Sequence, residues 1–247
     1  MGMFPLPVFA PDTYDSIAND LEKLDPASAL PLDTHSTIIA GYTAQMKLLA
    51  PALRSKYTAW LQFPLHAGPT TYYFNMHPLS RGTININISS PDSEPVVDYR
   101  VLTNPVDIRV DLAIVKAIRS YFSRPGEIQK LGPVEITPGA NVTSDADLQA
   151  WISGALGPTA FHPVGTCAKM PLELGGVVDK DLRVHGIGKL SVVDASIIPL
   201  IVGGTLQATV YAVAEKVSRI HFPTVSPLSP LIKCTGYEIE FSEKCAN

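Results

Sequence analysis

The stretch that decides the fold reads FHPVGTCAKM from Phe161, continues through KLSVVDASIIP, and ends with GGTLQATVY at Tyr211. Pro163 biases the backbone of His162 towards an extended conformation, and Gly165 permits a turn that other residues resist. An imidazole on a rigid turn suits a general base, because its unperturbed pKa lies near neutral pH. Taken alone, the pattern favours the plainer alternative, a structural histidine that bridges backbone groups in a turn.

The second half of this stretch predicts a strand, a break and a helix. Apolar residues from Leu190 to Val193 predict a short strand, which ends at Asp194-Ala195-Ser196. The pair Gly203-Gly204 then breaks the chain, and an apolar helix is expected over about 206–220. A strand, an acidic residue, a glycine break and a helix are typical of the neighbourhood of a bound cofactor, where the helix N-terminus is available to polar ligand groups.

Together these residues resemble the C-terminal signature of the glucose–methanol–choline (GMC) family of FAD-dependent oxidoreductases. The resemblance rests on HPVGTC at 162–167, GGVVD at 175–179, LRVHG at 182–186, VDAS at 193–196 with Pro199, and ATVYAVAEK at 208–216. Several linked blocks in the family's order are far more specific than any one of them. The match is strong over residues 160–220 and looser over 70–160, where HPLSRGT at 77–83 resembles the start of the substrate-domain sheet. It is weak before residue 60.

The resemblance implies roles for two catalytic residues. His162 matches the histidine that removes the hydroxyl proton of the substrate while hydride passes from carbon to the flavin. Thr205 stands where the family usually has His or Asn. Threonine donates one hydrogen bond but cannot act as a base near neutral pH, so His162 would remove the proton alone. An equally good interpretation is that Thr205 only caps the last helix.

The resemblance also implies an FAD site. The backbone of Asp194 and Ala195, and the first helical turn with Leu206 and Gln207, would approach the ribityl chain and the isoalloxazine ring. The helix N-terminus would place partial positive charge near the ring, which favours the anionic reduced flavin. The alternative for Asp194 is a turn residue at a strand end, and the assignment of Leu206 and Gln207 depends on the alignment register.

One expected element is missing. The family carries a strand followed by a Gly-rich turn that binds the FAD pyrophosphate, and no G-x-G-x-x-G occurs in this chain. We therefore predict a mixed α/β fold that combines an antiparallel-sheet substrate domain with the C-terminal strand and helix of an FAD-binding domain whose N-terminal Rossmann half is absent. The expected segments are a helical segment over 1–59, the substrate-binding sheet and helices over 60–158, the FAD-contacting segment over 159–222 and a tail over 223–247.

Hydrophobic periodicity predicts the individual elements. Helices are expected over 11–25 with Asp12 or Thr13 as N-cap, over 43–54, from Asn104 to about Arg124, and over 148–155 behind a Ser144 cap. Extended segments are expected over 57–66 and 70–77. The clearest strand is TININ at 83–87 and its continuation to Ser89, in which Ile84, Ile86 and Ile88 alternate with polar residues and predict a half-buried face.

Composition excludes some function classes. The net charge of −4 gives no reason to expect nucleic-acid binding, and no apolar run is long enough to span a membrane. The N-terminus lacks a signal-peptide pattern, whereas the sequons at Asn87 and Asn141 are compatible with a secreted form, so the localisation stays open. Cys234 and Cys245 flank a polar segment and would pair only in an oxidising compartment.

Three functions remain open at this stage. The resemblance favours oxidation of a small alcohol with FAD, followed by reoxidation by oxygen or another acceptor. A hydroxynitrile lyase that keeps FAD without redox chemistry is the first alternative, and a non-catalytic fragment unable to hold FAD alone is the second. His66 and His77 flank the aromatic residues Tyr72–Phe74, which would line a substrate pocket or serve as ordinary packing.

Overall fold

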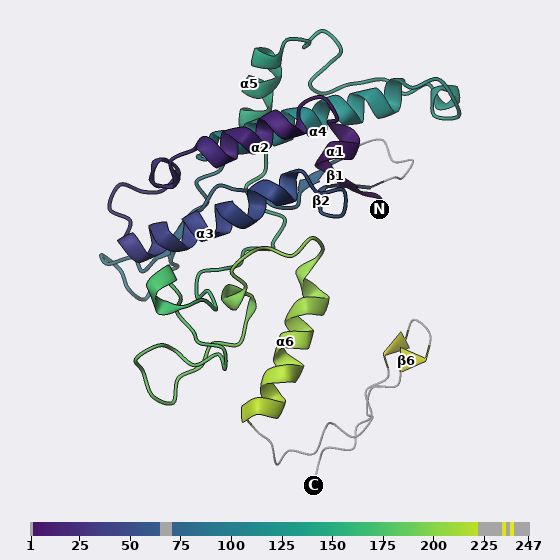
Figure 1. Ribbon diagram of the computed structural model, residues 1–247. Coiled ribbons are helices and arrows are strands. Elements are labelled where there is room, and N and C mark those ends of the chain that lie inside the picture. The colour runs from purple at the N-terminus through teal and green to yellow at the C-terminus, as the bar shows by residue number, and fades with distance from the viewer. Residues whose placement is uncertain (1, 65–70, 222–233, 236–237, 240–247) are drawn as a thin grey trace.

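The computed structural model describes residues 2–64, 71–221, 234–235 and 238–239 (Figure 1). Its helices are α1 (Leu6–Phe9), α2 (Tyr14–Lys23), α3 (Ser36–Leu53), α4 (Pro105–Ser123), α5 (Asp145–Ala155) and α6 (Leu206–His221), with 3-10 turns η1 (Pro26–Ala29), η2 (Gln129–Leu131), η3 (Leu172–Leu174) and η4 (Ala195–Ile197). Its strands are β1 (Gly2–Pro5), β2 (Ala59–Phe63), β3 (Phe74–Asn75), β4 (Thr83–Asn85), β5 (Val96–Asp98), β6 (Cys234–Thr235) and β7 (Glu238–Ile239).

The predicted helices form, with shifted ends. α3 begins at Ser36, seven residues before the expected start, because His35 caps it by accepting a hydrogen bond from the Thr37 N–H. Thr13 is the N-cap residue of α2 but makes no side-chain cap hydrogen bond. Ser144 caps α5 as expected, through a hydrogen bond from the Asp147 N–H to its hydroxyl oxygen.

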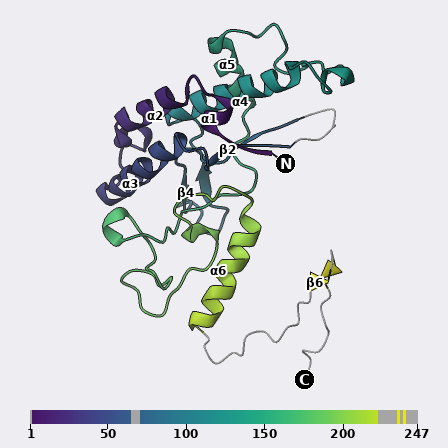
Figure 2. The ribbon, with the colours of Figure 1, turned by 45° about the vertical axis from the view of Figure 1, so that its right-hand side comes forward.

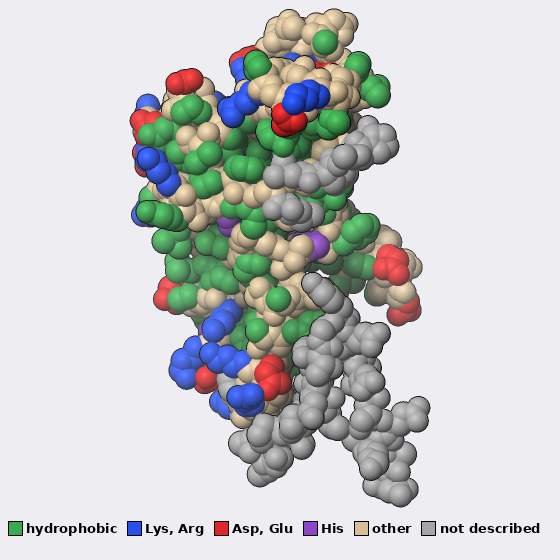
Figure 3. All heavy atoms as spheres, turned by 90° about the vertical axis from the view of Figure 1, so that its right-hand side faces the viewer, with side chains coloured by type: hydrophobic (Ala, Val, Ile, Leu, Met, Phe, Trp, Pro, Cys, Tyr) green, Lys and Arg blue, Asp and Glu red, His purple; other side chains and the backbone are tan. Residues whose placement is uncertain are grey.

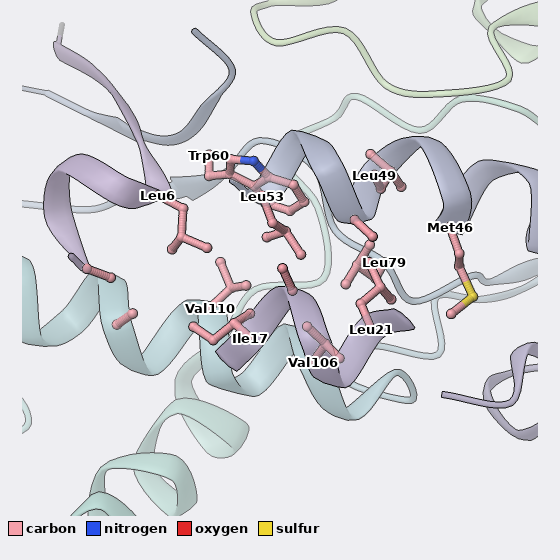
Figure 4. Close-up of a cluster of buried hydrophobic side chains, with 14 of the residues drawn as sticks. Leu6, Ile17, Leu21, Met46, Leu49, Leu53, Trp60, Leu79, Val106 and Val110 are labelled. Atoms are coloured by element: carbon pink, nitrogen blue, oxygen red, sulfur yellow. The ribbon is translucent and has the colours of Figure 1, made fainter. Parts of the chain in front are cut away.

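The main hydrophobic core lies between α2, α3, α4 and the strand β2 (Figure 4). Trp60 of β2 is fully buried, and its indole N–H donates to the Ala52 carbonyl at 3.2 Å. Leu53 and Val110 reach it from α3 and α4 and are equally buried. Because each such side chain contributes about 1.5–3 kcal/mol on burial, this cluster anchors the helices on the sheet.

The sheet beside this core confirms the antiparallel expectation and corrects one assignment. Its order is β1-β2-β3, with β1 antiparallel to β2 and β2 antiparallel to β3. The segment over 1–59 was predicted to be helical, yet its first residues form β1. A four-residue edge strand that begins with Gly-Met carries no period long enough to be recognised in the sequence.

The strand predicted over 83–89 forms only over its first three residues, and the prediction that its isoleucine face is half-buried is wrong. β4 has only three residues and pairs only with β5 among the described residues. Ile86 and Ile88 lie beyond it and are 73% and 90% exposed, and Ile84 is 48% exposed. The alternating pattern marks a face that needs a covering layer, and no described residue of this chain covers it.

The strand predicted over Leu190–Val193 is also wrong. This segment has irregular backbone whose one ladder contact is the isolated bridge between Arg183 and Ser191. Val192 and Val184 nevertheless contribute to a second, smaller core with Leu182. The apolar residues therefore pack as expected. Their backbone pairs with residues 182–184 through hydrogen bonds from the Val184 N–H to the Leu190 carbonyl and from the Val192 N–H to the Leu182 carbonyl, but this pairing amounts to one bridge and is too short to form a strand.

The segment over 160–221 is held against α3, as Figures 1 and 2 show from two directions. Gln45 of α3 donates its amide to the Pro199 carbonyl at 2.9 Å. Gly41, one turn earlier, lies so close to η3 that a Cβ on it would meet the Leu174 carbonyl oxygen at 2.1 Å. A glycine at this point of α3 thus permits the close approach of the two segments.

The segment predicted to be a tail contains one short ladder. β6 and β7 pair as a short antiparallel ladder, where no strand was predicted. Cys245 and His66 lie outside the described residues, so the suggested pairing with Cys234 is not addressed. Across the described residues, no helix combines the length and the hydropathy that crossing a bilayer requires.

Candidate active site

His162 lies on an irregular turn before α6 and is half-buried. Phe161 before it adopts a left-handed backbone with φ of +62° and is 94% exposed. The His162 Nδ1 contacts the Ala160 carbonyl oxygen. Since a carbonyl oxygen only accepts, Nδ1 carries the proton in the neutral imidazole, and Nε2 keeps its lone pair.

Backbone hydrogen bonds tie this turn to the segment around η4. The Cys167 N–H donates to the Ser196 carbonyl at 3.0 Å, and the Lys169 N–H donates to the Ile197 carbonyl at 2.8 Å. Gly165 has a φ of +87°, and a Cβ there would lie 3.2 Å from the Ile198 carbonyl oxygen. The glycine that the sequence marks as a turn residue therefore also permits close contact with the second block.

Asp194 is the cap residue of η4. Its Oδ1 accepts a hydrogen bond from the Ser196 N–H at 2.8 Å, and its side chain is otherwise exposed. The carboxylate is thus used locally, as the turn-residue alternative expected, and the backbone around Ala195 is what this turn offers to a ligand. The buried Ser196 hydroxyl makes no hydrogen bond to any described residue.

The start of α6 has one buried apolar residue between two exposed polar residues. Leu206 begins the helix and is buried in the same hydrophobic cluster as Ile197 of η4, against which Val164 of the His162 turn also packs. Thr205 immediately precedes the helix and is exposed, as is Gln207. The structure therefore brings together the His162 turn, η4 and the start of α6, and it leaves Thr205 and Gln207 exposed to solvent.

His77, whose role the sequence left open, contacts the segment that precedes α6. The imidazole of His77 is hydrogen-bonded to the Ile201 backbone, and its Nε2 lies 3.5 Å from the Cβ position of Gly203. Its ring also packs edge-to-face on Trp60, with centroids 5.3 Å apart. Burial lowers the pKa of His77, while the Ile201 contact acts in the opposite direction.

The buried carboxylate of Asp107 holds the HPLSRGT block at 77–83 in place. Asp107 of α4 accepts hydrogen bonds from the Leu79 N–H, the Ser80 N–H and the Ser80 hydroxyl at 2.6–2.7 Å. Arg81 in turn donates to three backbone carbonyls of its own turn and to Gln45 of α3. These contacts fix the turn that carries His77 on α3 and α4.

A second acid on α4 lies nearby with fewer partners. Asp111 is 1% exposed and accepts a hydrogen bond from the Asn75 amide at 3.4 Å. Burial, reinforced by the charge of Asp107, raises the pKa of Asp111 to about 8. At neutral pH this carboxyl group is therefore protonated.

A sequence model of the GMC oxidoreductase family matches residues 78–214, more than half of the chain. The chain belongs to the GMC oxidoreductase family. The matched range begins at the turn after His77 and ends inside α6, so it contains the His162 turn, η4 and the start of α6. The resemblance stated from the sequence is confirmed.

Relatives with solved structures share both sequence and fold with this GMC protein. An FAD-dependent oxidoreductase from Chaetomium thermophilum superposes with a TM-score of 0.85 at 32% identity, over 89% of this chain. A fungal aryl-alcohol oxidase superposes with a TM-score of 0.81 at 37% identity, over 88% of this chain. The chain spans 37% of each of these two structures.

A curated relative gives the same result. The dehydrogenase xptC of Emericella nidulans is 34% identical over 84% of this chain, which corresponds to 33% of the relative. The chain thus spans about a third of the length of its relatives. The activity of the whole enzyme is accordingly a matter of proposal for this chain.

Sequence reasoning and the structure can be compared only for which segments lie together. Sequence reasoning connected the His162 turn with η4 and α6 through the order of the family blocks. It did not bring His77 to the Gly203 side of the same segment, because no local signal links positions so distant in the chain. The described residues contain no group of three or more His, Cys, Asp or Glu side chains arranged for a metal ion.

Proposed function

We propose that this chain forms the C-terminal part of an FAD-dependent oxidoreductase that oxidises the CH–OH group of a small alcohol, with His162 as the base. The observation that supports it best is the contact of the His162 turn with η4 and the start of α6, in a chain whose relatives include an FAD-dependent oxidoreductase and an aryl-alcohol oxidase. Oxygen or another acceptor would complete the cycle.

The described residues fit one end of FAD. The N-terminus of α6 leaves backbone N–H groups free for polar ring atoms, and the Ser196 hydroxyl without a partner is suited to a ribityl hydroxyl. A Cβ at Gly204 would meet nothing within 4 Å, so the segment before α6 leaves room for a ring. We assign Ala195, Leu206 and Gln207 to this side of the site, with Asp194 acting as the cap that shapes the turn. Bound FAD would supply the hydride acceptor.

Proton removal falls to His162 in this proposal. With its Nδ1 proton directed to the Ala160 carbonyl, the Nε2 lone pair is free to take the proton of a substrate hydroxyl. The carbonyl also orients the ring and stabilises the imidazolium that forms. Thr205 then donates its hydroxyl hydrogen to the substrate oxygen, which it can do from its exposed position before α6.

The test joins residues 1–247 to the FAD-binding portion of the Chaetomium thermophilum oxidoreductase, in place of the corresponding part of that enzyme. We expect aryl or alkyl alcohols, mixed anaerobically with this chimaera, to bleach the flavin absorbance near 450 nm. Cleavage of mandelonitrile without bleaching would instead identify a lyase. A chimaera that binds FAD and does neither would contradict the proposed function; the parent oxidoreductase serves as the positive control.

A further inference from the structure

Two Asn-X-Ser/Thr sequons occur in the chain, at Asn87 and at Asn141, and neither takes part in the proposed chemistry. The asparagine of such a triplet is the acceptor of an N-linked glycan, which is bulky and needs a side chain at the surface of the folded protein. The structure distinguishes the two sequons by what surrounds each amide.

Asn141 lies in the irregular connection between η2 and α5, and its side chain is exposed. Its Oδ1 lies 3.0 Å from the position that a Cβ on Gly139 would occupy, so the glycine leaves room for the amide. The side chain makes no hydrogen bond with a described residue. Thr143, whose hydroxyl completes the sequon, is exposed as well, so both of its functional groups lie at the surface.

The backbone on either side of Asn141 is held from beneath. Arg119 of α4 donates to the Val142 carbonyl at 2.8 Å and to the Gly139 carbonyl at 3.3 Å, and its remaining contacts are with Glu135. The Val142 side chain packs on the hydrophobic cluster between α4 and α5. Because the residues around it are anchored inwards, Asn141 faces solvent in one fixed setting.

Asn87 has different surroundings. It is half-buried, and both branches of its amide are used: Nδ2 donates to the Ser93 hydroxyl at 3.2 Å, and Oδ1 accepts from the Ser89 N–H at 3.2 Å. It also stands between Ile86 and Ile88, which belong to the apolar face that needs a covering layer. A glycan on Asn87 would compete with all of these contacts.

We propose that Asn141 is an N-glycosylation site, modified when the chain is made in the secretory pathway, and that Asn87 is the poorer acceptor. The donor is a lipid-linked oligosaccharide diphosphate. The bond between its first sugar carbon and the diphosphate breaks, a bond from that carbon to the Asn141 Nδ2 forms, and Nδ2 loses one proton as the lipid diphosphate leaves. Neither FAD nor catalysis is needed for this modification. The connection before α5 and helix α6 lie at opposite ends of the molecule (Figure 1), so the glycan would leave the candidate site open.

The test translates the full chain, behind a cleavable secretory leader, in the presence of endoplasmic-reticulum microsomes. Only product protected from added protease is scored. Enzymatic release of the glycan in heavy-oxygen water converts the modified asparagine to a labelled aspartate, which mass spectrometry locates. We expect the label mainly at position 141, and we expect an endoglycosidase to remove the glycan from the native chain as readily as from the denatured chain.

Variants at two positions of the sequon separate its chemistry from folding. Asn141→Gln and Thr143→Ala should each abolish the glycan, whereas Thr143→Ser retains the sequon and should keep it, and Asn87→Gln should leave it in place. The label in the unsubstituted chain decides even if a variant fails to fold. A protected chain without a glycan, more label at Asn87 than at Asn141, or a glycan at Asn141 that only denaturation exposes would overturn the proposal.

Discussion

Asp111 is a buried carboxylic acid that lies near Asp107 and Tyr73 and accepts a hydrogen bond from the Asn75 amide. Asp107, one helical turn earlier, accepts three short hydrogen bonds, whereas the hydrogen bond that Asp111 accepts from a described residue is the long one from Asn75. The two acids on α4 therefore differ in function. Asp107 organises the turn before β4, and Asp111 stays protonated and links α4 to the strand that carries Asn75.

This difference predicts a pH dependence of stability. The pKa of Asp111 rises from 3.8 to about 8 on folding. The folded protein therefore holds the Asp111 proton more tightly than the unfolded chain, and the resulting stabilisation is fully present below pH 3.8 and is lost as the pH rises towards 8. The slope is about 1.4 kcal/mol per pH unit in that window. Asp111→Asn removes the titrating group and keeps an acceptor for Asn75. The free energy of unfolding of the variant, relative to that of the wild type, should therefore increase between pH 5 and 8.

Urea denaturation at pH 5, 6, 7 and 8 measures this gain. Asp92→Asn is the matched control, because Asp92 is exposed and should leave the pH profile parallel to that of the wild type. A constant free-energy difference between Asp111→Asn and the wild type at all four pH values would show that Asp111 is ionised in the folded protein.

At the scale of elements, α3 is the support on which the candidate site rests. It packs against α2 in the main core and against η3 on the opposite side, where Gly41 permits the close approach. Gly154 of α5 is also a helical glycine, but a Cβ there would meet nothing within 4 Å. The two positions form a natural pair for a substitution by alanine.

The pair predicts effects of opposite sign. Gly41→Ala places a methyl group against the Leu174 backbone and should destabilise the protein by about 1–3 kcal/mol. Gly154→Ala should stabilise it by about 0.5–1 kcal/mol, since alanine loses less conformational entropy in a helix. Thermal unfolding of both variants measures the difference. Equal midpoints would mean that α3 and η3 are not in the close contact described.

The same elements show what the sequence could predict. Helices α4, α5 and α6 follow from apolar spacing, and α5 also from its Ser144 cap, because a helix is stabilised by residues near in sequence. Two predictions are wrong: a strand over 190–193, and a half-buried face that includes Ile86 and Ile88. Strands need partners from elsewhere in the chain, and among the described residues these partners are short: three residues of β5 for β4, and a single bridge from Arg183 for the segment over 190–193.

The candidate site shows the same division between local and distant signals. The HPVG turn, η4 and α6 were grouped through block order, and their contacts agree with that grouping. The capping role of Asp194 depends on a single backbone hydrogen bond that composition cannot specify. The contact of His77 with Ile201 and Gly203 joins residues more than a hundred positions apart and needs the fold.

For the whole molecule, the main feature is apolar surface. Hydrophobic side chains are spread over much of the face in Figure 3, and charged side chains lie mainly towards its upper and lower ends and along its edges. Among the exposed residues, Phe161 and Ile88 are at least 90% exposed and Tyr211 of α6 is 71% exposed. Surface of this kind marks interaction sites or association.

This surface predicts the behaviour of the purified 247-residue chain. Without a Gly-rich pyrophosphate turn in the sequence, it should retain no stoichiometric flavin and appear colourless. It should also associate, so that light scattering after size exclusion gives a mass above the 26.6 kDa of one chain. A monodisperse yellow monomer would contradict both expectations.

The central claim is that His162 removes the substrate proton. It is tested most directly by the rate of anaerobic flavin reduction in the chimaera, measured with a saturating aryl alcohol for His162→Ala and for the unsubstituted chain. We predict a rate lower by about 10²–10⁴ for His162→Ala, with the flavin content unchanged, and an unaltered rate for the control His35→Ser. Flavin reduction at the unsubstituted rate in His162→Ala would contradict the account.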